Sequence, residues 1–182
     1  MHNEDRNLIA DLKQENKKEL ACHTLVKKYQ ERLYWHIRKI VMNHEDTDDV
    51  LQNTFIKVWK SIDSFRGESG LYTWLYRIAT NESITFLNSK KRKKMLPLND
   101  VSDYLMENLI SDPYFDGDRI QLELQKAILK LPEKQRIVFN LKYFEEMKYD
   151  DMSEVLGTSV GALKASYHHA VKKVEEYLKN SE

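Results

Sequence analysis

The residues that break helices are few in this chain, and they gather in short stretches. Its 182 residues include five glycines and three prolines. Gly67 and Gly70 share one stretch, Gly157 and Gly161 flank another, and 97–117 contains two of the prolines. Between these stretches apolar residues recur at the spacing of a helix face and rarely alternate with a period of two. The sequence therefore predicts an all-α fold.

Polar residues ahead of the apolar runs predict where individual helices begin. Asn16, with Glu19 three residues later, forms a capping box for a long helix that ends near Val41. Asp46 or Thr47 can cap the next helix. Apolar residues on one face of that helix are Leu51, Phe55, Val58 and Ile62.

The distribution of charge divides the chain into two parts. Lysine plus arginine equals aspartate plus glutamate, 29 each, so the net charge does not by itself indicate a nucleic-acid-binding protein. However, 88–94 reads NSKKRKK, whereas 95–118 contains six acidic residues and no lysine or arginine. The acidic stretch 95–117 also has little amphipathic pattern and is longer than most connections inside one domain. The reversal of charge and the length of this stretch together predict two small helical domains, 1–94 and 118–182. An acidic flexible linker, 95–117, joins them.

The C-terminal part has the pattern of a helix-turn-helix. Gly157 can adopt the positive φ that ends one helix, and Thr158 or Ser159 can cap the next. Apolar residues of this second helix form an inward stripe, namely Val160, Leu163, Tyr167, Val171 and Val174. The opposite side carries small residues that allow close approach and side chains that donate hydrogen bonds, namely Ser159, Gly161, Lys164, Ala165, His168, His169 and Lys172. An amphipathic helical hairpin with a solvated outer face is the alternative.

Four segments, in this order, together resemble one known family. DDVLQNTFIKVW (48–59), the segment 65–94, LPEKQRIVFNLKYFEEMKYDDMSEVLG (131–157) and LGTSVGALKASYHHA (156–170) are similar to extracytoplasmic-function (ECF, group IV) sigma factors of bacterial RNA polymerase, in the sigma-70 superfamily. The resemblance covers roughly residues 18–178. It implies that 1–94 is region 2-like and that 118–182 is region 4-like.

By this resemblance, the helix 48–59 binds the clamp of the largest polymerase subunit. The residues implied in this contact are Asp48, Asp49, Gln52, Asn53 and Ile56. Asn53 stands where the family more often has an acidic residue, so the resemblance does not decide whether the charge contact at this position is made. A solvated acidic face is the alternative for these residues.

The segment 65–94 resembles the part of the family that opens and reads the −10 element. The residues implied in DNA contact are Phe65, Arg66, Gly67, Tyr72, Trp74, Arg77, Asn81, Lys90, Lys91 and Arg92. Aromatic rings can stack an unpaired base, and cations can contact phosphates. Trp74 can instead pack inside the domain. Thr85 and Asn88 replace residues common in the family, so the base preference cannot be transferred.

The resemblance also implies the partners. These are core RNA polymerase, through its clamp and the flap of the second-largest subunit, promoter DNA read at −35 by the helix-turn-helix, and an anti-sigma factor. The acidic linker is implied to thread the RNA-exit path, with a plain solvated tether as the alternative. We expect no small-molecule substrate, cofactor, metal or membrane insertion.

Two other function classes account for less of the chain. A stand-alone helix-turn-helix regulator explains 144–178 but leaves 48–59 and 65–94 without a role. An enzyme would need a phosphate loop, a metal-spaced His/Cys set or a nucleophile–base pair, and the sequence offers none. No apolar run approaches the ~20 residues of a membrane span, the N-terminus is unlike a signal peptide, and Cys22 is the single cysteine. We therefore expect a non-enzymatic cytoplasmic protein.

Overall fold

The computed structural model describes residues 3–67, 69–94, 100–112 and 117–181. Within these ranges every element of regular secondary structure is a helix. The elements are α1 (Asn3–Leu12), α2 (Lys18–Val41), α3 (His44–Ser61), the 3-10 turn η1 (Ile62–Ser64), α4 (Leu71–Lys94), α5 (Asp100–Ile110), α6 (Arg119–Leu129), α7 (Glu133–Tyr143), α8 (Tyr149–Leu156) and α9 (Val160–Lys179). The predicted all-α fold is confirmed.

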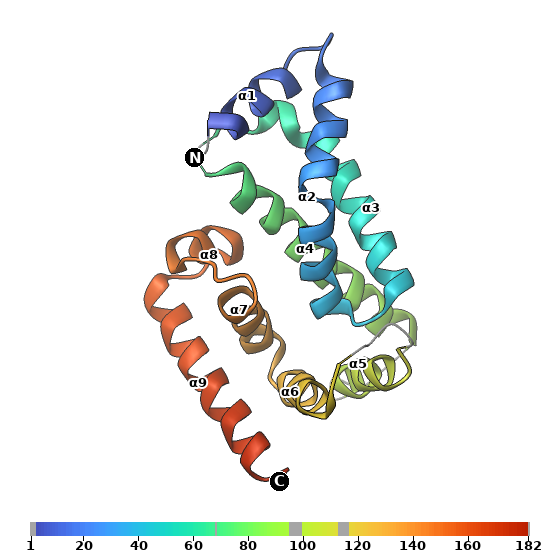
Figure 1. Ribbon diagram of the computed structural model, residues 1–182, viewed down its shortest axis with the longest axis vertical. Coiled ribbons are helices and arrows are strands. Elements are labelled where there is room, and N and C mark those ends of the chain that lie inside the picture. Colours follow the sequence, from blue (N-terminus) through green and yellow to red (C-terminus); the bar gives the residue numbers. More distant parts are fainter. Residues whose placement is uncertain (1–2, 68, 95–99, 113–116, 182) are drawn as a thin grey trace.

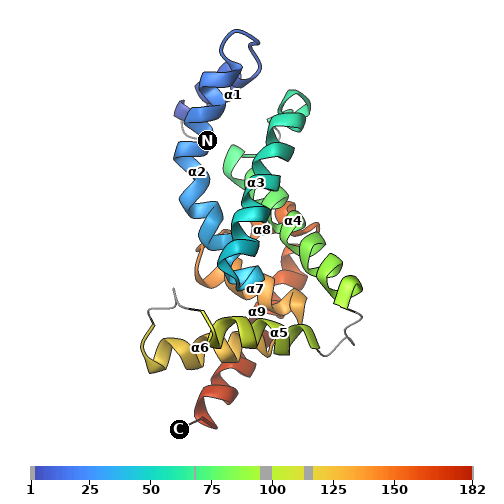
Figure 2. The same cartoon turned by 90° about the vertical axis from the view of Figure 1, so that its right-hand side faces the viewer.

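The helices form two groups that lie against each other. Helices α1 to α4 make the upper group in Figure 1, and α6 to α9 make the lower one. Figure 2 shows α5 and α6 running across the molecule below α2 and α3, with the C-terminal part of α9 extending beyond them. Buried side chains of α2, α3 and α4, including Leu33, Val58 and Leu75, fill the first group. Ile128, Phe139 and Val174 pack together in the second group and are buried.

Two predicted helix starts are wrong, although the predicted end of the first of these helices, near Val41, is confirmed. Helix α2 begins at Lys18 without a side-chain cap, because Asn16 lies inside a hydrogen-bonded turn that precedes it. Helix α3 is capped by Asn43, whose extended backbone lets its side chain accept from the Asp46 backbone N–H at 2.9 Å. Asp46 and Thr47 therefore lie inside the helix and are buried.

The helix-turn-helix is confirmed as a structural unit. Gly157 ends α8 with φ +61°, and Ser159 caps α9 by accepting from the Ala162 backbone N–H. Leu163 and Val174, from the predicted inward stripe, are buried against neighbouring helices.

Residues 100–110 form a helix where the sequence pattern indicated little amphipathic character. Leu105 and Leu109 of α5 are four residues apart and buried, so the helix has an apolar face after all. The Tyr104 hydroxyl donates to Asp46 Oδ2 at 3.0 Å, which ties α5 to α3. The remaining linker residues 95–99 and 113–116 lie outside the described residues, and the flexibility of the linker stays a prediction.

The N-terminal helix α1 was not predicted. It packs on α2, and the buried Asp5 carboxylate accepts from the Tyr29 hydroxyl at 3.0 Å and from Lys28 Nζ at 2.9 Å. In the turn after α1, Lys13 Nζ donates to the Phe65 backbone carbonyl at 2.6 Å. The N-terminal segment thereby contacts the loop that precedes α4.

The two helix groups share a hydrophobic core. One continuous cluster of buried side chains extends from Leu8 in α1 to Leu163 in α9. Its members in the second group include Ile137, Met152 and Val155. Helix α8 packs against α4, and α7 packs against α2. The predicted boundaries of the two domains remain predictions, since the structure joins both groups in one core.

Candidate nucleic-acid interface

The outer face of α9 presents the residues predicted for the −35 contact. All of them are exposed, namely Ser159, Gly161, Lys164, Ala165, His168, His169 and Lys172. A Cβ placed on Gly161 would meet nothing within 4 Å, so the surface in front of it is open. Lys164 Nζ lies 5.7 Å from the centre of the Tyr149 ring of α8, which keeps the ammonium near the N-terminal end of α9. The structure therefore brings these residues together on one accessible strip.

The outer face of α3 forms a second accessible strip. The predicted polymerase-binding residues Asp48, Asp49, Gln52, Asn53 and Ile56 are all exposed. Val50, Thr54 and Val58 are buried on the opposite side and fix the orientation of the helix. Ile56 keeps 45% of its surface exposed and Trp59 keeps 42%, so apolar side chains lie beside the acidic ones.

The loop 65–70 and the start of α4 contain the aromatic residues predicted for the −10 strand. Phe65 is buried and stacks on Trp74, with 4.8 Å between the ring centres. Trp74 is partly buried by this contact, which agrees with the packing alternative, while its contact with DNA stays a prediction. Gly67 has φ +74°, a backbone conformation that favours glycine, and Arg66 is exposed.

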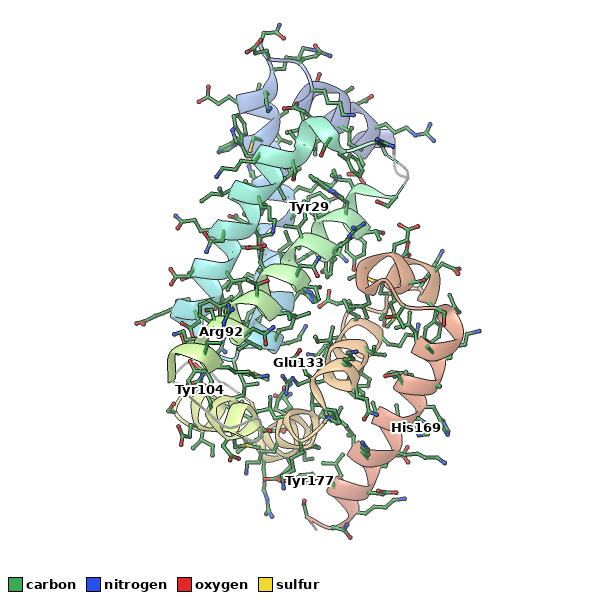
Figure 3. All side chains as sticks on the ribbon, turned by 180° about the vertical axis from the view of Figure 1, so that it is seen from behind. Tyr29, Arg92, Tyr104, Glu133, His169 and Tyr177 are labelled. Carbon is green, nitrogen blue, oxygen red and sulfur yellow. The ribbon has the colours of Figure 1, made fainter. Side chains whose placement is uncertain are left out.

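The rest of α4 carries exposed polar residues and two lysines that form ion pairs. Arg77, Asn81 and Arg92 are exposed on this helix. Lys90 Nζ, by contrast, lies 3.0 Å from Asp46 Oδ1, and Lys91 Nζ lies 3.6 Å from Glu133 Oε2 of α7. Tyr72 is partly buried beside the second helix group, where it stacks on Tyr76. In Figure 3, Arg92 near the end of α4 and His169 on α9 lie on opposite sides of the view.

A cluster between the two helix groups was missed by the sequence analysis. Glu145, which follows α7, accepts from Lys39 Nζ at 3.2 Å and from the Tyr76 hydroxyl at 2.6 Å. Burial and the hydrogen bond to Glu145 raise the pKa of Tyr76. His36 packs on Tyr76, and complete burial lowers its pKa to about 4. These residues come from distant parts of the chain, so no local spacing could have revealed them.

The described part of the chain contains no group of three or more His, Cys, Asp or Glu side chains arranged to hold a metal ion. In this described part of the chain, no helix is both long enough and apolar enough to cross a membrane. Cys22 is partly buried, and burial raises the pKa of its thiol.

Comparison with known proteins accounts for both helix groups. The family model for Sigma-70 region 2 matches residues 25–93, and the one for Sigma-70 region 4 matches 121–174. The chain is 30% identical over 179 residues to the ECF RNA polymerase sigma-E factor of Haemophilus influenzae, covering 94% of this chain and 93% of that protein. It is also 30% identical over 168 residues to the ECF RNA polymerase sigma factor SigW of Bacillus subtilis, covering 88% of this chain and 90% of SigW.

Two solved structures share the fold. CnrH, in complex with the cytosolic domain of CnrY, superposes with a TM-score of 0.72 at 23% identity, covering 98% of this chain and 99% of CnrH. RpoE, in complex with the anti-sigma factor NepR from Bartonella quintana, gives a TM-score of 0.68 at 21% identity, covering 86% of this chain and 96% of RpoE. The chain therefore belongs to the ECF family of RNA polymerase sigma factors.

Proposed function

We propose that this sigma factor directs core RNA polymerase to its promoters by dividing the work among three surfaces. Helix α3 binds the polymerase clamp, the loop 65–70 with α4 captures and opens the −10 element, and α9 reads the −35 element. The observation that carries the proposal is the exposed strip of small and cationic residues on α9, which is backed by a buried apolar face. The roles proposed for α3 and for α4 follow from the charge and the exposed apolar area of those two surfaces.

The chemistry of α9 suits a major groove. Gly161 and Ala165 leave no bulky side chain between the helix and the base edges. Lys164, His168 and Lys172 supply donors that can reach base acceptors or phosphates. The second helix of a helix-turn-helix places its N-terminal residues against the bases, which is where Gly161 and Lys164 lie.

The face of α3 suits a basic protein surface rather than DNA. Asp48 and Asp49 would repel phosphates, whereas a cationic coiled segment of polymerase would pair with them. Ile56 and Trp59 add exposed apolar area beside these charges, as the centre of a protein–protein contact requires. We assign polymerase binding to this face for that reason.

The first part of α4 suits an unpaired strand. Tyr72 and Trp74 keep part of their rings exposed, and base–aromatic stacking contributes ~1–3 kcal/mol per base. Arg66, Arg77 and Arg92 are exposed cations that can follow the phosphates on either side. The protein supplies recognition only, and the catalytic step of transcription belongs to polymerase.

An anti-sigma factor completes the proposed set of partners. RpoE is solved with the anti-sigma factor NepR, and CnrH with the cytosolic domain of CnrY. The similarity of fold supports an equivalent cytoplasmic partner for this chain. We also propose that the acidic linker imitates RNA in the polymerase exit path, since Asp103 and Glu107 are exposed on α5. Replacing both with amides should alter the ratio of abortive to full-length transcripts, and an unchanged ratio would remove this role.

In vitro transcription tests the proposed function directly. Bacterial core RNA polymerase is incubated with fragmented host DNA, with and without the protein, and transcript starts are mapped. Protein-dependent starts downstream of a shared pair of spaced motifs are expected. If no new starts arise and the protein does not co-elute with core polymerase in gel filtration, the stand-alone regulator becomes the better explanation.

A further inference from the structure

Two lysines tie the N-terminal segment to the loop that precedes α4. Lys13 follows α1, and its Nζ donates to the Phe65 backbone carbonyl at 2.6 Å. Lys18 begins α2, and its Nζ lies 2.8 Å from Asp63 Oδ2 in the 3-10 turn η1. In Figures 1 and 2, α1, the end of α3 and the start of α4 lie together at one end of the molecule. The junction of α1 and α2 therefore contacts the chain on both sides of Ser64.

The N-terminal segment is itself packed on the first helix group. Leu12 of α1 is buried and belongs to the same hydrophobic cluster as Phe65. The carboxylate of Asp5, also in α1, accepts from the Tyr29 hydroxyl of α2 at 3.0 Å. Lys13 therefore extends from a packed helix rather than from a loose chain end, so its hydrogen bond can restrain the loop.

Phe65 connects this hydrogen bond to residues that are proposed to meet the −10 strand. Its ring stacks on Trp74, with 4.8 Å between the ring centres. Because a peptide unit is planar, fixing the Phe65 carbonyl also fixes the orientation of the Arg66 amide that follows. Gly67 comes next with φ +74°, and a Cβ placed on it would meet nothing within 4 Å, so open space surrounds this part of the loop. The bond from Lys13 is therefore made where the loop leaves the packed part of the molecule.

We propose that the N-terminal segment 3–18 braces the strand-capturing loop 65–70, and that Lys13 is the positioning residue through which it acts. The segment lies ahead of the residues matched to Sigma-70 region 2. Lys13 fixes the backbone that carries Arg66 and packs on Trp74, and itself contacts no base. Without its bond the loop adopts a wider range of conformations, and ordering it on the strand costs more free energy. This inference rests on the proposed function of the loop and of α4.

Three variants separate the hydrogen bond from the charge. Lys13→Met keeps a side chain of similar length but has no donor, whereas Lys13→Arg keeps the charge and the donors. Lys17→Met is the matched control, because Lys17 lies in the same turn but its Nζ is 3.0 Å from Asp11 Oδ1, within the N-terminal segment. Both lysines are exposed, so all three variants should fold as the wild type does.

The first readout is the preference of the holoenzyme for its own −10 strand. The full-length protein is bound to core polymerase, and affinities are measured for two promoter fragments with a single-stranded −10 element. One fragment comes from a promoter that the transcription experiment maps, and the other has its −10 bases replaced. A misplaced loop weakens binding of the cognate strand alone, whereas a lost phosphate contact or a less stable protein weakens binding of both fragments equally. The ratio of the two affinities therefore measures positioning.

Lys13→Met is expected to lower this ratio by about fivefold, which corresponds to about 1 kcal/mol, the usual contribution of one hydrogen bond. Lys13→Arg should keep most of the preference, and Lys17→Met should keep all of it. An unchanged ratio in Lys13→Met would overturn the positioning role. An equal fall in Lys17→Met would assign the effect to the charge of the turn, and would overturn it as well.

Hydrogen exchange of the free protein tests the brace without DNA. The Phe65 N–H donates to the Ile62 carbonyl at 3.1 Å, so its exchange rate measures how often the chain opens just before the loop. This rate should rise by about fivefold in Lys13→Met and stay unchanged in Lys17→Met. Equal rates in Lys13→Met and wild type would show that Lys13 does not hold the loop, and would overturn the proposal whatever the DNA result.

A failure of the proposed function gives a different pattern. In that case the wild-type holoenzyme itself would bind both fragments equally, and the role of Lys13 in strand capture would be overturned with the function. The exchange rates would still decide whether Lys13 braces the loop.

Discussion

Lys164 and Lys173 are lysines of the same helix with different surroundings. Lys164 lies on the exposed strip of α9, whereas Lys173 Nζ donates to Gln135 Oε1 of α7 at 3.0 Å. We expect Lys164→Ala to lower −35-dependent transcription by at least about fivefold, the effect of one lost base or phosphate contact of ~1 kcal/mol. Run-off transcription on promoters with intact and scrambled −35 elements measures this effect.

The matched control is Lys173→Ala, which removes the same charge from the side of α9 that faces α7. It should leave promoter choice unchanged, and both variants should bind core polymerase as the wild type does in gel filtration. Equal loss of core binding and transcription in Lys164→Ala would contradict the assignment of α9 to DNA.

His36 predicts a pH dependence of stability. Its pKa is lowered to about 4 by burial, from 6.5 for the ordinary side chain, with Glu145 raising it and Lys39 lowering it by smaller amounts. Between pH 6.5 and 4 the unfolded chain therefore binds a proton that the folded chain does not. Stability should fall as the pH drops through this window, by about 3 kcal/mol in total from this group.

Urea unfolding between pH 7 and pH 4.5 checks this sign. The control is His36→Gln, which cannot titrate but retains a hydrogen-bonding group beside the Thr80 hydroxyl, 2.8 Å from His36 Nε2 in the wild type. The free energy of unfolding is plotted against pH for both proteins, and the difference between the two slopes gives the contribution of His36. Equal slopes over this pH range would refute this contribution.

At the scale of elements, one glycine in the α8–α9 turn and one in the first turn of α9 have different roles. Gly157 has φ +61°, so Gly157→Ala strains the backbone and should lower the free energy of unfolding by about 1 kcal/mol. Gly161 lies inside α9 with open space before it, so Gly161→Ala should raise stability by about 0.5–1 kcal/mol. The same methyl group nevertheless projects toward the proposed DNA, so −35-dependent transcription should fall.

Denaturant unfolding and run-off transcription on the two variants separate these effects. A Gly161→Ala protein that is more stable and less active on −35-dependent promoters places Gly161 at the DNA. A variant that is more stable and equally active would mean that the groove does not approach this part of α9.

Local patterns predicted the elements whose signals lie close together in sequence. The turn at Gly157, the cap at Ser159 and the outward faces of α3 and α9 follow from the helical period and could be predicted. The capping residue Asn43 was missed because Asp46 and Thr47 are equally good cap types. Helix α5 was missed because its apolar face consists of few residues within an acidic stretch, and its docking partner Asp46 is distant in sequence.

At the scale of the whole molecule, the sequence could not predict how the two groups pack. The Tyr76–Glu145 bond joins residues 69 positions apart, and Asn140 contacts a carbonyl 101 positions away. Charged side chains are ordinarily solvated, so neither Lys39 in α2 nor Glu145 after α7 indicates a buried contact by type. The packing of the two helix groups depends on the complementarity of their surfaces, which no periodicity encodes.

The shared core predicts cooperative unfolding of the free protein. Because buried residues of both groups form one cluster, differential scanning calorimetry should show a single transition in the wild type, with equal van't Hoff and calorimetric enthalpies. Glu145→Ala should lower the midpoint by about 2–4 °C per kcal/mol lost and reduce the van't Hoff enthalpy below the calorimetric one, because the modules then unfold partly independently. Glu146→Ala should keep the single transition. Two resolved transitions in the wild type would show that the two helix groups unfold independently in spite of the buried cluster that joins them.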